Sequence, residues 1–171
     1  MKILVACIGN IFLGDDAFGV EMARHLEERI ASDRVCVVDY GIRGYDLAYA
    51  LTEGYDAAIL VDAASRGQAP GTLYIIRPDS HAGVEAGAPS LDAHSLNPMA
   101  VLRMAASTGG VLPPVFVVGC EPKVLETPDG EFGLSPEVAA AVPRAVEMVD
   151  RLVGSLLKTL IPSSAGLVPA T

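Results

Sequence analysis

Acidic side chains stand where two strands of a predicted sheet end. The pair Asp15 and Asp16 follows the loop after the first predicted strand, and Asp62 comes directly after the apolar run 57–61. The carboxyl ends of neighbouring parallel strands meet at one crevice, which is where such sheets bind ligands. If the first and third strands are neighbours, Asp16 and Asp62 form a carboxylate pair suited to metal binding or acid–base catalysis.

The acidic pair also has an ordinary structural explanation. Asp15 and Asp16 precede a predicted helix, so one of them can cap that helix while the other favours its positive amino-terminal end. Asp62 has no comparable explanation, because neither a turn nor a cap requires an acid after the buried strand. We expect Asp15 to serve the helix and Asp16 to face Asp62.

A histidine would complete a three-ligand site. His25 is predicted to lie on the polar face of the first helix, four residues after Glu21, which indicates a solvated pair. His81 has no positional argument. His94 precedes a helix start in a loop able to fold over the crevice. Two carboxylates and one imidazole leave room for water or substrate and suit zinc or nickel.

The elements that position these side chains alternate along the chain. We predict strands at 2–7, 35–38, 57–61, 73–76 and 115–118, and helices at 16–31, 45–51, from 97 onward and from 135 to 160. Parallel strands joined by helical crossovers give a three-layer α/β/α sandwich with a mostly parallel, twisted sheet. The strand 73–76 follows a Pro-Gly turn and is the candidate for an antiparallel edge. We expect one domain over 1–160 and a flexible tail over 161–171.

The composition narrows the class of protein. Hydrophobic residues make up 51% of the 171 residues, which suits strands covered on both faces. The net charge is −9 and only three of the twelve basic residues are lysines, so nucleic acid is not an expected partner. No apolar run approaches the roughly 20 residues of a membrane-spanning helix.

Three cysteines, Cys7, Cys36 and Cys120, are far apart and odd in number. This pattern favours reduced, buried thiols in a cytoplasmic protein. Cys7 and Cys120 lie near predicted strand ends and are a less favoured alternative as soft metal ligands.

The opening of the chain resembles the hydrogenase maturation endopeptidases. The run Ile3–Val20 has their strand, Gly-Asn, apolar residues and acidic pair before a helix with glycine. Further matching positions follow in order: Asp39 with Gly41 and Gly44, Val61-Asp62-Ala63, Pro70-Gly71-Thr72, Ser90 with His94, Gly119 to Pro122, and Gly133-Leu134-Ser135. The resemblance covers roughly residues 2 to 155.

The resemblance implies an aspartic-type, metal-dependent endopeptidase. Such a protein removes a C-terminal extension from the large-subunit precursor of a nickel–iron hydrogenase after nickel insertion. The family's metal-binding positions correspond to Asp16, Asp62 and His94, and either carboxylate would act as the catalytic base. The metal would be nickel supplied by the substrate, although zinc or another divalent ion would also fit these ligands.

One loop departs from the usual family pattern. The segment 39–44 carries Ile-Arg where many relatives have a small residue or Thr. Because this loop follows a predicted strand end, Asp39, Gly41 and Arg43 are expected to border the crevice and contact the precursor. An arginine without a role in binding is the alternative.

Two other functions are alternatives to the endopeptidase. A peptidyl-tRNA hydrolase-like esterase shares an early Gly-Asn but requires a basic groove for RNA, which this acidic chain lacks. A non-enzymatic nucleotide- or flavin-binding module would place phosphate at the loop 9–14. That loop has no known phosphate-binding motif, and its acidic pair would repel phosphate.

Overall fold

The computed structural model describes residues 2–78, 98–125 and 132–159. Its elements are β1 (Ile3–Ile8), the 3₁₀ turn η1 (Gly14–Ala17), α1 (Phe18–Arg29), β2 (Val35–Gly41), α2 (Gly44–Ala50), β3 (Ala57–Ala63), β4 (Leu73–Ile76), α3 (Pro98–Ser107), β5 (Val115–Cys120) and α4 (Pro136–Thr159). None of these helices combines the length and hydropathy needed to cross a bilayer. The predicted tail over 161–171 lies outside the described residues.

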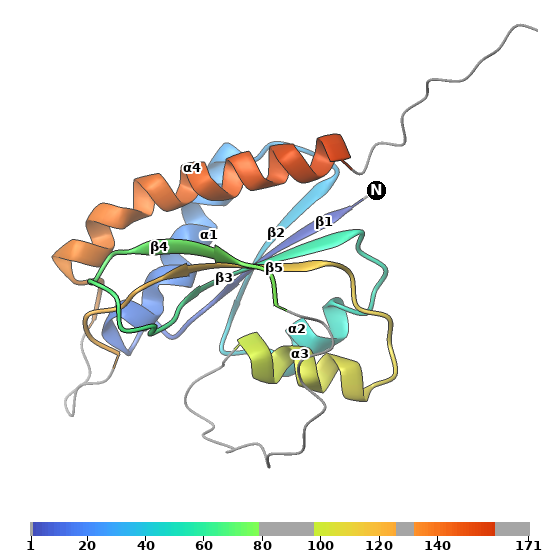
Figure 1. The fold of residues 1–171 in the computed structure, drawn as a ribbon, viewed down its shortest axis with the longest axis horizontal. Coiled ribbons are helices and arrows are strands. Elements are labelled where there is room, and N and C mark those ends of the chain that lie inside the picture. Colours follow the sequence, from blue (N-terminus) through green and yellow to red (C-terminus); the bar gives the residue numbers. More distant parts are fainter. Residues whose placement is uncertain (1, 79–97, 126–131, 160–171) are drawn as a thin grey trace, which may run out of the picture.

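The five strands form one sheet in the order β2-β1-β3-β5-β4. The first four pair in parallel, and β4 is an antiparallel edge strand, as predicted. Helices α1 and α4 cover one face of the sheet, and α2 and α3 cover the other (Figure 1). The predicted α/β/α sandwich and the neighbouring positions of the first and third strands are therefore confirmed.

Two hydrophobic cores fill the space between these layers. The core under α1 and α4 contains Ile3, Val5, Cys7, Ile59 and Val61 with the apolar stripes of the two helices. The core under α2 and α3 contains Leu4, Ala6, Ala58, Leu60 and Val117. Successive side chains of a strand point to opposite faces, so these two sets of alternating residues show that β1 and β3 are buried on both sides.

The ends of the strands differ from the sequence prediction in a way that affects the site. A bulge between β1 and β2 lets Ile8 pair with Gly41, so Asp39 and Gly41 belong to β2 rather than following it. The backbone of Gly41 has a φ of 52°, a conformation that glycine adopts without strain. Asp16 lies in η1, one turn before α1, rather than inside the α-helix.

Candidate functional site

The structure brings Asp16 and Asp62 to the carboxyl ends of two paired strands. Cys7 near the end of β1 pairs with Val61 of β3, and Asp62 is the next residue. Asp62 is buried, with 4% exposure, and Asp16 is half-buried. Burial and the nearby charge of Asp16 both raise the pKa of Asp62 well above its usual value, against one backbone hydrogen bond from Ala63. Each carboxyl group therefore disfavours the charged form of the other at this end of the sheet.

The loop after β1 holds Asp16 in this position. The backbone N–H of Asn10 donates to Oδ2 of Asp16 at 2.8 Å. Burial raises the pKa of Asp16, and this hydrogen bond offsets the shift in part. A side chain on Gly9 would place its Cβ 1.9 Å from the Asp16 carbonyl oxygen, so the loop closes this tightly only with glycine there.

Gly19 brings the start of α1 down onto both strands. A Cβ at this position would lie 1.9 Å from the carbonyl oxygen of Ile8 and 2.7 Å from that of Val61. These carbonyls belong to β1 and β3, the two strands that lead to the acids. The missing side chain therefore lets the helix sit directly over the strand ends, which places η1 beside Asp62.

Asp15 has a different role from the one predicted. It is fully buried, and its carboxylate accepts hydrogen bonds from the backbone N–H groups of Lys123, Val124 and Ser135 at 2.7, 3.0 and 2.6 Å. The Ser135 hydroxyl is also 3.0 Å from Oδ2 of Asp15. Neither η1 nor α1 has a side-chain capping bond, so Asp15 does not serve the helix as its cap. Asp15 instead ties the segment after β5 to the start of α4.

The predicted substrate-binding residues of β2 adjoin the loop after β1. The N–H of Gly9 donates to the carbonyl of Gly41 at 3.1 Å, and Oδ1 of Asp39 accepts from the N–H of Gly41 at 2.8 Å. Arg43 Nε donates to the Tyr40 carbonyl at 3.1 Å, and its Nη2 donates to the Asp39 carbonyl. Arg43 thus supports the backbone of this turn while remaining exposed. Its contact with the precursor stays a prediction.

Glu121 is an acid that the sequence analysis missed. It directly follows β5, is 4% exposed, and accepts hydrogen bonds from the backbone N–H groups of Arg66 and Gly67 at 2.8 and 3.1 Å. An acid immediately after a buried strand is the signal that identified Asp62, but the predicted strand ends at residue 118, two residues before β5 does. Glu121 fixes the segment that leaves β3 just beyond Asp62.

Tyr74 of β4 also contributes to this end of the sheet. Its hydroxyl donates to the carbonyl of Ala64, two residues after Asp62. Burial raises the pKa of Tyr74 to about 12, with smaller contributions from the charges of Glu121 and Asp62. At neutral pH Tyr74 is therefore a hydrogen-bond donor rather than a base.

The third predicted ligand, His94, lies outside the described residues, as does His81. Within the described ranges, no group of three His, Cys, Asp or Glu side chains is arranged to hold a metal ion. Cys7 and Cys120 pack into the core under α1 and α4, and burial raises the pKa of both thiols, which disfavours the thiolate that binds metal. The prediction of three buried cysteines is wrong for Cys36, which is exposed.

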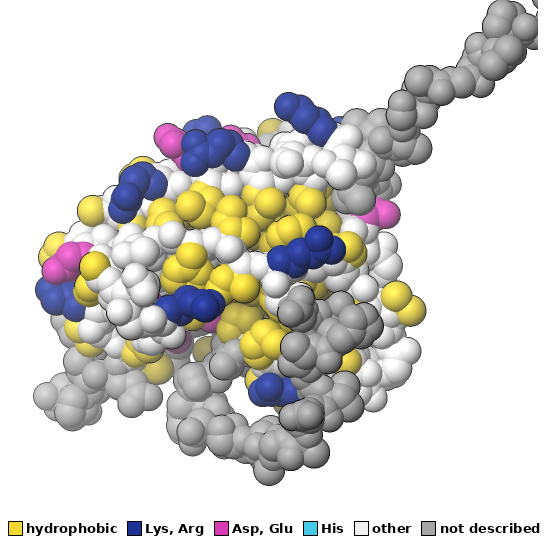
Figure 2. Space-filling model, viewed as in Figure 1, with side chains coloured by type: hydrophobic (Ala, Val, Ile, Leu, Met, Phe, Trp, Pro, Cys, Tyr) yellow, Lys and Arg dark blue, Asp and Glu magenta, His cyan; other side chains and the backbone are white. Residues whose placement is uncertain are grey.

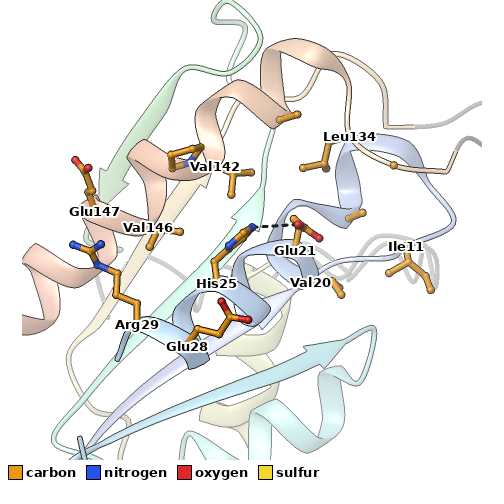
Figure 3. Close-up of a pocket in the computed structure, with 14 residues that line it drawn as sticks. Ile11, Val20, Glu21, His25, Glu28, Arg29, Leu134, Val142, Val146 and Glu147 are labelled. Atoms are coloured by element: carbon orange, nitrogen blue, oxygen red, sulfur yellow. Dashed lines mark ion pairs between the residues drawn. The ribbon is translucent and has the colours of Figure 1, made fainter. Parts of the chain in front are cut away.

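A groove of about 930 Å³ runs between α1 and α4 (Figure 3). His25 lies on its floor, and Nε2 of His25 is 3.2 Å from Oε1 of Glu21, the solvated pair that the spacing predicted. Neither Asp16 nor Asp62 lines this groove. The volume of a groove does not by itself indicate a catalytic function, so we place the candidate site at the carboxylate pair.

Comparison with known proteins gives one consistent family. The model of the hydrogenase maturation proteases matches residues 20–151. A putative hydrogenase maturation protease from Methanocaldococcus jannaschii is 36% identical over 148 residues, covering 86% of this chain and 93% of its own length. The hydrogenase 2 maturation protease of Escherichia coli is 34% identical over 151 residues, covering 87% of this chain and 88% of its own.

Solved structures agree with the sequence comparison. The hydrogenase maturating endopeptidase HybD from Escherichia coli superposes with a TM-score of 0.70 at 32% identity, covering 93% of this chain and 94% of that one. This chain belongs to the hydrogenase maturation protease family. It is therefore a hydrolase of the endopeptidase class.

Proposed function

We propose that this protease removes the C-terminal extension of a nickel–iron hydrogenase large-subunit precursor, in the cytoplasm, after nickel has been inserted. In this proposal Asp16 and Asp62 bind the nickel carried by the precursor, with His94 as the third ligand. Zinc or another divalent ion would occupy the same ligands in its place. Cleavage would thereby depend on completed metal insertion.

The observation that carries this proposal is the carboxylate pair, in which Asp62 is buried and Asp16 is half-buried. Burial raises the pKa of both carboxyl groups, and the charge of Asp16 adds to the shift at Asp62. A cation between two such carboxylates removes their repulsion and replaces the lost water, which is why paired acids commonly hold metals. The charged form of both carboxylates is therefore lower in free energy with the substrate's metal bound than without it.

Two steps of the reaction follow from the same geometry. A metal ion held at this site by the precursor would polarise the scissile carbonyl. Asp16 or Asp62 would act as the general base of an aspartic-type hydrolysis and take a proton from the attacking water. Acid would protonate the pair, so cleavage should decline as the pH falls through the raised pKa values.

The test is to incubate the protein with nickel-loaded and nickel-free precursor and measure the mass of the product. Cleavage of the loaded form alone is the expected result. Equal cleavage of both forms would exclude the nickel requirement, and cleavage of neither would exclude this substrate. When Asp62→Asn is tested in the same assay, Asp33→Asn is its matched control. Asp33 is exposed and precedes β2 at the opposite end of the sheet.

A further inference from the structure

A second cavity, of about 600 Å³, lies on the α2–α3 face of the sheet, and its lining begins at Ala64, two residues after Asp62. It is lined by the segment after β3, by β4 and β5, and by the start of α3, and its lining includes Ala64, Arg66 and Tyr74. Figure 2 looks onto the β4 edge of the sheet and shows Lys and Arg side chains standing singly around a band of hydrophobic side chains below α4.

The cavity begins at the level of Asp62. Ala58 and Leu60 face the core under α2 and α3, so the alternation of β3 directs Asp62 to the same face. Asp62 pairs with Gly119 of β5, and Gly119 pairs with Tyr74 of β4. A Cβ on Gly119 would lie 2.1 Å from the Tyr74 ring, which shows that the ring covers this glycine. The row Asp62, Gly119, Tyr74 therefore leads from the acid into the cavity.

Arg66 stands at the end of this row. Its Cζ lies 5.4 Å from the centre of the Tyr74 ring, and its backbone N–H is held by the buried carboxylate of Glu121. Within the described residues, no carboxylate forms an ion pair with the Arg66 side chain. A guanidinium stacked on a ring keeps its N–H edge available, and that edge binds carboxylates in a bidentate manner.

We propose that Arg66 is a specificity-determining residue that binds an acidic side chain of the precursor close to the scissile bond. This inference rests on the proposed function. Two strand spacings separate Asp62 from Tyr74, a distance of roughly 10 Å. About three extended residues span that length, so the acidic side chain should lie within about three residues of the cut.

The main test compares Arg66→Ala with the wild type on the loaded precursor. We expect KM to rise roughly 10-fold and kcat to change less than twofold, because a charged hydrogen bond used in binding is lost. Arg66→Ala keeps the backbone N–H that donates a hydrogen bond to Glu121, so the fold should be retained. Arg151→Ala is the control, because Arg151 is exposed on α4, which covers the opposite face of the sheet.

A charge exchange tests the pairing itself. Neutralising the acidic residue in the precursor should raise KM for the wild type as much as Arg66→Ala does. With the Arg66→Ala protein, the same change in the precursor should raise KM no further. Arg66→Glu combined with Arg at the precursor position should restore KM. An unchanged KM for Arg66→Ala, or a precursor with no acid in this window, would overturn the proposal. So would an equal effect from amidating the precursor's C-terminus, because that assigns the anion to the chain end.

Binding measured without cleavage separates this inference from the proposed function. Fluorescence anisotropy of labelled precursor should show weaker binding to Arg66→Ala than to the wild type, whether or not the wild type cuts. If the wild type binds without cutting and Arg66→Ala binds more weakly, the proposed function fails while Arg66 keeps its role in binding the precursor. If the wild type cuts and both proteins bind equally, the role of Arg66 fails alone.

Discussion

Asp15 and Asp62 are both buried aspartates, but their surroundings are opposite. The Asp15 carboxylate accepts hydrogen bonds from three backbone N–H groups and one hydroxyl. Asp62 has one backbone donor, Ala63, and faces the like charge of Asp16. A carboxylate that accepts four hydrogen bonds holds chain segments together, whereas a desolvated and repelled one is relieved by a cation. The Asp15 arrangement stabilises the fold, whereas the Asp62 arrangement favours binding of a cation.

The largest expected effect concerns activity at the repelled pair. Asp62→Asn should lower kcat for precursor cleavage roughly 10²–10⁴-fold, the usual contribution of a general base. The measurement is the cleavage rate of nickel-loaded precursor, with circular dichroism to establish folding. Full cleavage by a folded Asp62→Asn protein would remove Asp62 from the site and end the contrast with Asp15.

The next effect concerns stability at the satisfied carboxylate. Asp15→Ala leaves several buried donors without an acceptor and should lower the free energy of unfolding by about 3–4 kcal/mol. Urea unfolding followed by circular dichroism measures this change. Asp33→Ala, at an exposed aspartate, should stay within about 0.5 kcal/mol of the wild type. A similarly small change for Asp15→Ala would mean that its hydrogen bonds hold nothing together.

The smallest effect is a gain in stability at the repelled pair. The pKa values of Asp16 and Asp62 are raised on folding, so above the ordinary aspartate pKa of about 3.9 the folded state holds more protons than the unfolded state. The free energy of unfolding therefore falls as the pH rises through the raised values. Asp62→Asn removes this loss and should raise the free energy of unfolding by about 1–2 kcal/mol at pH 7.

The same measurement at low pH provides the control for this gain. Below the ordinary aspartate pKa, Asp62 is neutral in both states, so the difference between Asp62→Asn and the wild type should shrink. Unfolding curves at pH 7 and at about pH 3 compare the two conditions. An advantage that is independent of pH would show that repulsion between the carboxylates is not its source.

Much of the fold could be predicted because its signals are local. Alternating buried strands and amphipathic helices indicate an α/β sandwich, and Ser135 with Pro136 marks the start of α4. The bulge that carries β2 through Gly41 could not be predicted, since it depends on pairing between two strands. Asp15 was misassigned for a related reason: its partners, Lys123 and Ser135, are more than a hundred residues away in the sequence.

Residue types and spacing alone determined the strands, the position of Asp62 at a strand end and the family resemblance. Those features depend on hydrophobic periodicity and on short motifs, which are properties of neighbouring residues. Only the tertiary structure decided that Asp15 binds the segment before α4, and that Arg66 stacks on Tyr74 near the acids. These contacts join residues distant in sequence, so their geometry exists only once the sheet and its loops are assembled.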